Sequence, residues 1–283
     1  MRWLGGRRGG GVEDRRGLSG GGVMAGGGIG VAVIALIGYF VFGIDPTTTS
    51  QLASQFGGAG SQEQGTVGTP EDQAGQFVDV VGANINDVWT AKMNGYTPPK
   101  VVLYTQGTGT QCGFGQAAMG PFYCPNDSTV YLDLSFWQDM ETQLGASGAD
   151  FARAYVIAHE FGHHIQTLTG ASQKVREAQQ AARSQEQANQ YSVALELQAD
   201  CYAGVWATSA AAASNGEVAL ESGEFAEGMK TANAIGDDTL QKRGGGGVNP
   251  ENFTHGSSAQ RMEWLNRGYQ SGDPAQCDTF STL

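Results

Sequence analysis

The apolar positions in most of the chain after residue 76 recur with the period of an α-helix. Four of them share one helix face near the start of this part: Phe77, Val80, Val81 and Ile85. The same pattern predicts further helices over about 149–169, over 172–213 as one or two helices, and over 223–235 and 258–268. Two short segments suit strands instead, residues 100–104 (KVVLY) and the alternating residues 129–134 (TVYLDL). Few strands followed by many helices predict an α+β fold, mainly helical with a small β-sheet.

One segment of the chain is apolar along its whole length rather than on one face. Residues 23–44 hold no charged side chain over 22 positions, which is long enough to span a bilayer as one helix. Residues 1–22 carry five arginines against two carboxylates, so their net charge is 5 − 2 = +3. The positive-inside rule then places the N-terminus in the cytoplasm and residues 45–283 outside. A cleaved signal peptide is the alternative, but the apolar stretch is longer than a usual h-region and no clean A-x-A site follows it.

These features divide the chain into four predicted parts. Residues 1–22 form a cytoplasmic, basic, glycine-rich tail, and residues 23–44 form a transmembrane signal-anchor helix. Residues 45–75 are polar with few large apolar groups, so they are predicted to be a disordered linker. Residues 76–283 are long enough to bury a sizeable core, and they form the folded domain.

Charge and cysteine content narrow the partners and the compartment. The whole chain has a net charge of −12, so the part after residue 22 carries −12 − 3 = −15. An acidic body excludes nucleic acid as a partner, because phosphate binding needs a basic patch. The four cysteines form no CxxC pair, and an even count suits disulfides in an oxidising compartment. Three pairings are possible, and proximity favours Cys112 with Cys124, which leaves Cys201 with Cys277.

Residues 159–163 read His-Glu-Phe-Gly-His within an amphipathic helical segment. His159 and His163 are four residues apart, so both imidazoles lie on one helix face and can reach one cation. Zinc accepts neutral imidazole nitrogens, and Glu160 beside the metal is placed to take a proton from its bound water. Gly162 would let a neighbouring element pack close to this helix. The alternative is a surface helix with spare histidines, but three of the chain's four histidines lie here.

A catalytic zinc site needs a third protein ligand and one position open for water. The metzincin pattern requires glycine and histidine where this chain has Gln166 and Thr169, so that class is excluded. Glu196 is a better candidate than the distant His255, because its predicted helix is apolar nearly all round and buried carboxylates need partners. Asp200 lies one turn later on the same face, where it can fix the tautomer of a ligand histidine. The alternative is a solvated acidic pair on an amphipathic helix.

Three further features complete the candidate site. His255 precedes a capping box formed by Ser257 and Gln260, and it is a candidate catalytic donor to an oxyanion, with an ordinary turn histidine as the alternative. His164 points about 100° away from His163 around the helix, so it is predicted to pack or to support the site rather than bind metal. Residues 129–134 are either a core strand or an edge strand that pairs with an extended substrate.

Several segments together resemble those of the bacterial neutral zinc metallopeptidases, which are single-pass membrane proteins with a gluzincin-type site. The matching segments are AMGPFYCP and VYLDLSF near 117–136, AHEFGHHIQ at 158–166, ELQADCYAG at 196–204 and THGSSAQR at 254–261. The resemblance covers most of residues 76–270 and the N-terminal anchor. It implies a zincin-like domain in which His159, His163 and Glu196 hold one zinc ion per chain and Glu160 is the catalytic base.

The combined interpretation is a membrane-anchored, zinc-dependent endopeptidase that hydrolyses peptide bonds with a zinc-activated water. Its expected partners are a peptide or protein substrate and the bacterial inner membrane, with the catalytic domain extracytoplasmic. The alternative is a catalytically inactive, metallopeptidase-like binding module that recruits a partner protein, and the intact Glu160 argues against it. An intramembrane protease is excluded because the motif helix carries Asp150, Arg153 and Gln166, far from the predicted span.

Overall fold

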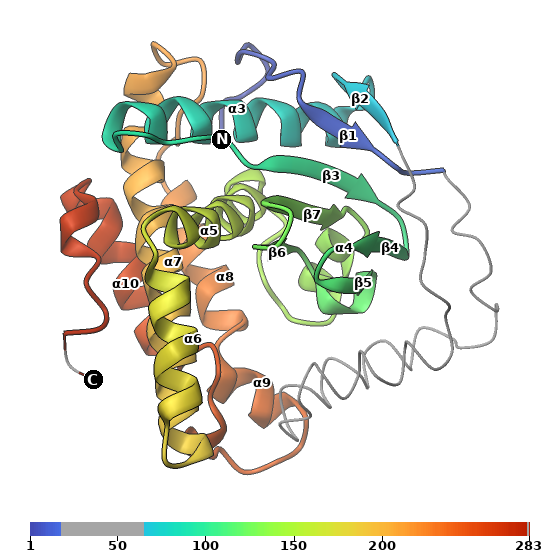
Figure 1. Cartoon of the computed structure of the whole chain (residues 1–283). Helices are drawn as coiled ribbons and strands as arrows, with labels where there is room; N and C mark the ends of the chain where they lie inside the picture. Colours follow the sequence, from blue (N-terminus) through green and yellow to red (C-terminus); the bar gives the residue numbers. More distant parts are fainter. Residues whose placement is uncertain (18–64, 282) are drawn as a thin grey trace.

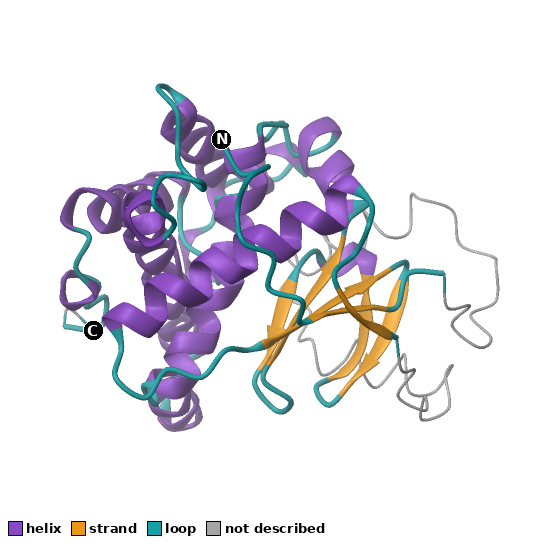
Figure 2. Ribbon diagram, turned by 90° about the horizontal axis from the view of Figure 1, so that it is seen from above, coloured by secondary structure: helices purple, strands orange, loops and turns teal. Residues whose placement is uncertain are grey.

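A five-stranded sheet forms one side of the structure and most of the helices form the other (Figures 1 and 2). The computed structural model describes residues 1–17, 65–281 and 283. In spatial order the sheet contains β2 (Thr66–Gly68), β1 (Val12–Asp14), β3 (Lys100–Tyr104), β7 (Thr129–Asp133) and β6 (Phe122–Cys124). β1, β3 and β7 run parallel, whereas β2 and β6 are antiparallel to their neighbours. β4 (Gly107–Thr110) and β5 (Gly113–Gln116) form a separate antiparallel hairpin.

The helices account for most of the described chain. They are α3 (Gln73–Lys92), α4 (Phe136–Thr142), α5 (Asp150–Leu168), α6 (Ala171–Ala181), α7 (Gln185–Ala213), α8 (Glu224–Ala234), α9 (Asp237–Arg243) and α10 (Ser258–Ser271). Short 3-10 turns cover Ala117–Met119, Pro250–Asn252 and Pro274–Gln276. The predicted α+β fold is confirmed, as are the predicted strands and longer helices. The sequence pattern missed α4 and α9 because two helical turns are too short to display a period.

The core lies where α5 and α7 pack against each other and against α3. Phe151 of α5 stacks on Trp206 of α7 with ring centroids 6.3 Å apart, and neither side chain is exposed. Asn84 of α3 accepts a hydrogen bond from the Trp206 indole at 2.8 Å and donates one to the Ala210 carbonyl at 3.0 Å. These bonds satisfy the polar atoms that the packing buries. The pairing of α5 with α7 fixes the relative positions of the two helices that carry the candidate ligands.

Residues 1–17 pack onto this domain, which corrects the prediction of a separate tail over 1–22 and a domain that begins at 76. β1 pairs in parallel with β3, so that Val12 lies opposite Val101. Trp3 is 5% exposed, meets Phe77 edge-on and donates its indole hydrogen to Asp150 at 2.9 Å. Burial of a tryptophan contributes several kcal/mol of stability, on the order of 3 to 5. The N-terminal arm, residues 1–17, therefore belongs to the folded unit.

Four of the five arginines of the N-terminal arm are paired with carboxylates. The pairs are Arg7 with Asp87, Arg8 with Asp79, Arg15 with Glu13, and Arg16 with both Asp14 and Asp72. The prediction used these positive charges as a cytoplasmic signal, but several of them bind α3 or the residue that caps it. A segment that shares a core and ion pairs with the domain lies on the same side of a membrane as the domain. The packing thus contradicts the expected placement of the arm inside and the domain outside.

The linker prediction for residues 45–75 is wrong for its last part. β2 pairs with β1, and α3 begins at Gln73 after Asp72, whose side chain accepts a hydrogen bond from the Gly75 amide at 3.0 Å. A strand of three residues gives too little alternation to be recognised in a sequence. Residues 45–64 lie outside the described part of the chain, and so does the predicted anchor at 23–44. Within the described residues, no helix combines the length and apolar character needed to cross a membrane.

Two disulfides fasten the structure at separate places. Cys112 at the tip of the β4–β5 hairpin joins Cys124 of β6, and Cys201 of α7 joins Cys277 beyond α10. This is the pairing that proximity in sequence favours. The strand predicted at 129–134 is β7, and it lies between β3 and β6 in the interior of the sheet. The possibility that it is an edge strand is therefore wrong, and β6 takes the edge position beside it.

Candidate metal centre

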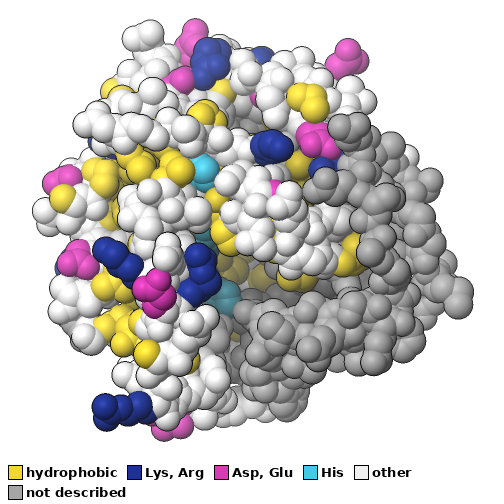
Figure 3. All heavy atoms as spheres, viewed as in Figure 1, with side chains coloured by type: hydrophobic (Ala, Val, Ile, Leu, Met, Phe, Trp, Pro, Cys, Tyr) yellow, Lys and Arg dark blue, Asp and Glu magenta, His cyan; other side chains and the backbone are white. Residues whose placement is uncertain are grey.

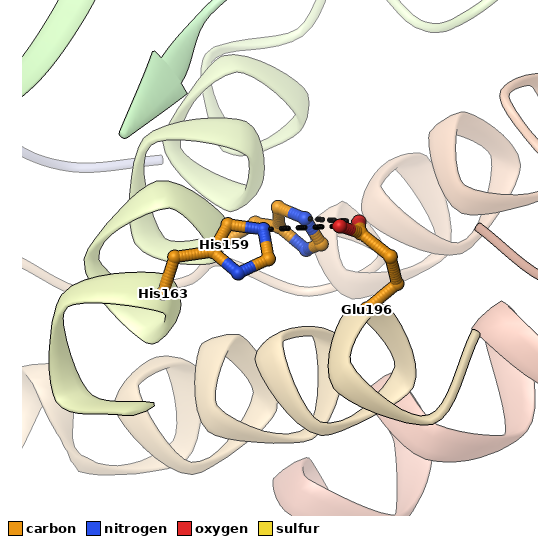
Figure 4. A group of neighbouring side chains, drawn as sticks. All are labelled: His159, His163 and Glu196. Atoms are coloured by element: carbon orange, nitrogen blue, oxygen red, sulfur yellow. Dashed lines mark hydrogen bonds and ion pairs between the residues drawn. The ribbon is translucent and has the colours of Figure 1, made fainter. Parts of the chain in front are cut away.

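Three side chains from two helices converge at one point, as Figure 4 shows. His159 and His163 project from the same face of α5, and Glu196 projects toward them from α7. One ligand atom of each residue lies within 4.8 Å of the other two. The Glu196 carboxylate is 3.1 Å from His159 Nε2 and 3.4 Å from His163 Nε2. The spacing of four residues on α5 produces this arrangement, because it brings both imidazoles to one side of the helix.

Both imidazoles are oriented through their other nitrogen. His159 Nδ1 lies 2.8 Å from the Asp200 carboxylate, and His163 Nδ1 lies 2.9 Å from the side-chain oxygen of Gln166. These oxygens only accept hydrogen bonds, so each Nδ1 carries the hydrogen and each Nε2 faces Glu196. Gln166 is fully buried and also donates to the Leu195 carbonyl of α7 at 2.6 Å. Asp200 was a candidate from the sequence, whereas Gln166 was missed, although its place one turn after His163 was a usable signal.

The electrostatics of the three side chains favour positive charge between them. Burial opposes a charge on His159, yet Asp200 and Glu196 raise its pKa to about 10. Burial likewise disfavours the charged form of Glu196, but the neighbouring histidines hold its pKa well below the usual range. The His163 pKa is lowered, chiefly by burial. Two ionised carboxylates on either side of His159 therefore favour a cation at this point, whether a proton or a metal ion.

The donor set suits zinc. Catalytic zinc ions are often held by two imidazole nitrogens and one carboxylate oxygen, with a fourth position left for water. Here the two histidines lie four residues apart and the carboxylate comes from a later helix. The orienting oxygens of Asp200 and Gln166 supply the outer partners that such histidines need. His159 is 6% exposed, while His163 and Glu196 are half-buried, so one side of the group faces outward. Histidine side chains are visible from outside near the centre of the face in Figure 3.

Glu160 follows His159 on α5 and is 7% exposed. Burial and the nearby Glu196 raise its pKa to about 8, and the positive groups around it work in the opposite direction. A carboxyl group with a pKa near neutrality exchanges a proton readily under physiological conditions, which is a property of general bases. Its position beside the three converging side chains agrees with the role that the sequence predicts for it.

His255 lies in the loop before α10 and interacts electrostatically with this group. Its pKa is raised, since the attraction of Glu196 and Asp237 exceeds the effect of burial. The Asp237 carboxylate accepts hydrogen bonds from the backbone amides of Thr254, His255 and Gly256 at 2.8, 2.7 and 2.9 Å. The predicted capping box of α10 follows directly. Asp237, at the start of α9, was missed in the sequence because α9 itself was missed, and it holds the loop that carries His255.

His164 does not join the converging side chains. Its Nε2 lies 2.6 Å from the Thr97 carbonyl, and its Nδ1 lies 3.1 Å from the Tyr123 hydroxyl. The contacts connect α5 to β6 and to the loop before β3. This agrees with the packing role predicted from its position around the helix.

Gly162 sits between the two histidines at the contact of α5 with α7. A Cβ atom on this residue would come within 2.9 Å of the Ala199 Cα and 3.1 Å of the Ala199 carbonyl oxygen. Only a glycine permits the two helices to approach this closely. Ala199 precedes Asp200 and lies three residues after Glu196, so the close approach sets the distance across which Glu196 and Asp200 reach the histidines. The glycine in the motif predicted that another element packs closely at Gly162, but the sequence did not show that this neighbour is Ala199 of α7.

The fold and the site define a class of protein, namely one in which a His-Glu-x-x-His helix and a carboxylate from a later helix form a group that could hold a metal ion. The chain belongs to the family described as "Putative neutral zinc metallopeptidase", whose model matches residues 1–280. The match confirms the family that the sequence resembles, and it includes the N-terminal arm as well as the domain. The family implies zinc as the metal, hydrolysis as the reaction and a peptide or protein as the substrate.

Relatives of similar length support the assignment to the family. The chain is 46% identical over 294 aligned positions to "Uncharacterized protein YpfJ" of Escherichia coli (strain K12), an alignment that covers 99% of both chains. It is 44% identical over 210 positions to "Uncharacterized protein Rv2575" of Mycobacterium tuberculosis (strain ATCC 25618 / H37Rv), covering 72% of this chain and 70% of that protein. No solved structure matches the chain significantly.

Proposed function

We propose that this protein is a zinc-dependent endopeptidase that binds one zinc ion per chain through His159, His163 and Glu196. The convergence of the three ligand atoms within 4.8 Å of one another is the observation that carries the proposal. Both Nε2 atoms are turned toward Glu196 by hydrogen bonds on the opposite side of each ring. A zinc ion held there supplies Lewis acidity that polarises a peptide carbonyl and acidifies water.

Glu160 is the general base in this proposal. Its carboxylate takes a proton from the attacking water and later delivers that proton to the nitrogen of the leaving amine. Burial raises the pKa of this carboxyl group, which makes the protonated form needed for the second transfer more accessible than it is for an exposed glutamate.

His255 is the proposed donor to the oxyanion that develops on the carbonyl. The Asp237 carboxylate fixes the backbone at positions 254–256, and it lies 3.5 Å from the ring Nδ1 of His255. Glu196 and Asp237 raise the pKa of His255 despite its burial, so the cationic form that donates a hydrogen bond is favoured. Preorganised donors of this kind contribute about 3 to 4 kcal/mol of transition-state stabilisation.

The substrate is proposed to bind as an extended chain along β6. This strand pairs with β7 alone among the described strands, and it packs against α5. Its outer edge offers backbone amides and carbonyls to a peptide, which is the usual way that a sheet edge binds an extended segment. The Cys112–Cys124 disulfide attaches this strand to the β4–β5 hairpin and so limits its movement.

Substitution of Glu160 by glutamine tests the proposal. The Glu160→Gln variant is expected to bind one zinc ion like the unaltered protein and to cleave an unfolded protein such as casein 100- to 10,000-fold more slowly, roughly the range for loss of a general base. Glu177→Gln, an exposed change on α6, is the matched control and leaves both properties unchanged. Cleavage by Glu160→Gln at the unaltered rate would show that Glu160 is not the base. Zinc binding without any cleavage by the unaltered protein would favour a binding module instead.

A further inference from the structure

α10 approaches α7 closely. A Cβ atom on Gly268 would collide with the Cys201 carbonyl, and one on Gly204 would collide with the Leu265 carbonyl. The two glycines therefore allow backbone contact between the helices, and the Cys201–Cys277 disulfide fixes the chain beyond α10 to α7. As a result, the first turn of α10 lies beside the segment of α7 that contains Asp200.

Arg261 occupies this first turn and is 4% exposed. Two nitrogens of its guanidinium group donate hydrogen bonds to the Asp200 carboxylate. Nε donates to Oδ2 at 2.8 Å, and a terminal nitrogen donates to Oδ1 at 3.0 Å. Asp200 is completely buried. Of the arginines and lysines that the structure describes, Arg261 is the one that forms an ion pair with it. A planar fork that matches both carboxylate oxygens sets the rotation of the carboxylate as well as its position.

The fixed carboxylate in turn contacts the candidate site. Asp200 Oδ1 lies 2.8 Å from His159 Nδ1 and accepts a hydrogen bond from the Tyr155 hydroxyl at 2.6 Å. Arg261 also lies 3.3 Å from that hydroxyl oxygen. Four side chains from α5, α7 and α10 therefore form one buried hydrogen-bonded group that ends at His159 Nε2, the atom that faces Glu196.

We infer that Arg261 is a positioning residue for the metal centre: it fixes Asp200 so that His159 presents Nε2 to the metal. The inference rests on the proposed zinc site and adds a residue that contacts neither the metal nor the substrate.

A purely structural role for Arg261 is the competing explanation. The ion pair would then serve only to attach α10 to α7. That attachment has other sources in this fold, namely the glycine contacts, the Cys201–Cys277 disulfide and the fully buried Leu265. Loss of Arg261 is therefore expected to leave α10 in place while it releases Asp200.

The test measures zinc affinity of the full chain in a double-mutant cycle. Arg261→Met removes the fork and keeps the length of the side chain, Asp200→Asn removes its carboxylate partner, and the third variant combines both changes. Arg267→Met on the same helix is the control, because Arg267 is exposed and lies over the Trp264 ring. Zinc dissociation constants come from competition with a chelator. Circular dichroism and thiol counting, both on metal-free protein, confirm the fold and the two disulfides.

Arg261→Met is expected to bind zinc 10- to 100-fold more weakly, the usual range for loss of an outer partner of a metal ligand. Arg261→Lys, which supplies charge without a fork, falls between this variant and the unaltered protein. In the Asp200→Asn background, Arg261→Met causes little further loss, because the two residues act through one contact. If Arg261→Met unfolds, Arg261→Lys takes its place in the cycle, and its effect on zinc affinity is compared in the presence of Asp200 and in the Asp200→Asn background.

Unchanged zinc affinity in folded Arg261→Met, or independent and additive effects of the two substitutions, would overturn the inference. Absorption spectra of the cobalt-substituted proteins give a second readout, since a purely structural residue would leave the ligand field unaltered. The outcomes also separate this inference from the proposed function. If the unaltered protein binds no zinc, the proposed function fails; if it binds zinc and Arg261→Met binds equally well, only the positioning role fails.

Discussion

Substitution of Gly162 by alanine is expected to disturb the metal centre without a change to any side chain that contacts it. Gly162 lies between His159 and His163 on α5, and its Cα faces Ala199 of α7. The added methyl group would meet the Ala199 Cα at 2.9 Å. The Ala199 Cα belongs to the backbone in the middle of α7, so a side-chain rotation cannot relieve the overlap.

The size of the disturbance follows from the geometry. Ordinary contacts of a Cβ atom begin near 3.4 Å, so α5 and α7 must separate by about 0.5 Å at this point. A metal site tolerates displacements of about 0.2 Å in its ligand distances. Glu196 lies less than one turn before Ala199 and moves with it, away from the histidines. Overpacking of this kind costs roughly 1 to 3 kcal/mol of folding stability, and a loss of ligand geometry adds a decrease in zinc affinity.

Zinc affinity by chelator competition and thermal unfolding with and without zinc provide the assay. Gly82→Ala on α3 is the matched control, because its Cβ would meet only the Phe161 ring, at an ordinary 3.6 Å. That change is expected to leave zinc binding intact and to stabilise the helix by about 0.5 to 1 kcal/mol. If Gly162→Ala binds zinc as tightly as the unaltered protein and unfolds at the same temperature, the claim that this helix contact sets the ligand geometry is refuted.

Three further predictions concern the folded unit. Trp3→Ala is expected to destabilise the protein by about 3 to 5 kcal/mol, measured by denaturant unfolding; no change would mean that the arm does not dock. Arg16 lowers the pKa of Asp72 to about 2 from its ordinary 3.8, so this carboxylate stabilises the fold above pH 4 and the contribution is lost as the pH falls toward 2. In Asp72→Asn the melting temperature should therefore fall less steeply between pH 4 and pH 2 than in the unaltered protein. An equally steep fall would contradict the pairing of Asp72 with Arg16. Loss of the Cys201–Cys277 disulfide, which closes a loop of 76 residues, is expected to cost roughly 4 to 5 kcal/mol; a melting temperature insensitive to its removal would argue against it.

Local pattern was sufficient for most of the secondary structure. The helix spacing of His159 and His163 and the apolar surroundings of Glu196 were sufficient to identify the three converging side chains from the sequence. These features depend on positions within one helix turn, which a sequence displays directly. Proximity in sequence also favoured the disulfide pairing that the structure contains.

The parts that sequence reasoning missed depend on contacts between distant segments. β1 and Trp3 are separated from β3 and Phe77 by a long stretch of chain, and a three-residue strand beside five arginines resembles a basic tail. Arg261 reaches Asp200 only because glycines on α7 and α10 permit a close approach. A glycine in a helix predicts that some backbone comes near, but the sequence does not name the partner.

The most direct test of the central claim is anomalous X-ray scattering at the zinc absorption edge from crystals of the full chain grown with zinc. The account predicts one strong peak per chain, about 2.0 to 2.2 Å from the Nε2 atoms of His159 and His163 and from a carboxylate oxygen of Glu196. A peak at any other place, or none between α5 and α7, would contradict the proposed metal centre and with it the peptidase function.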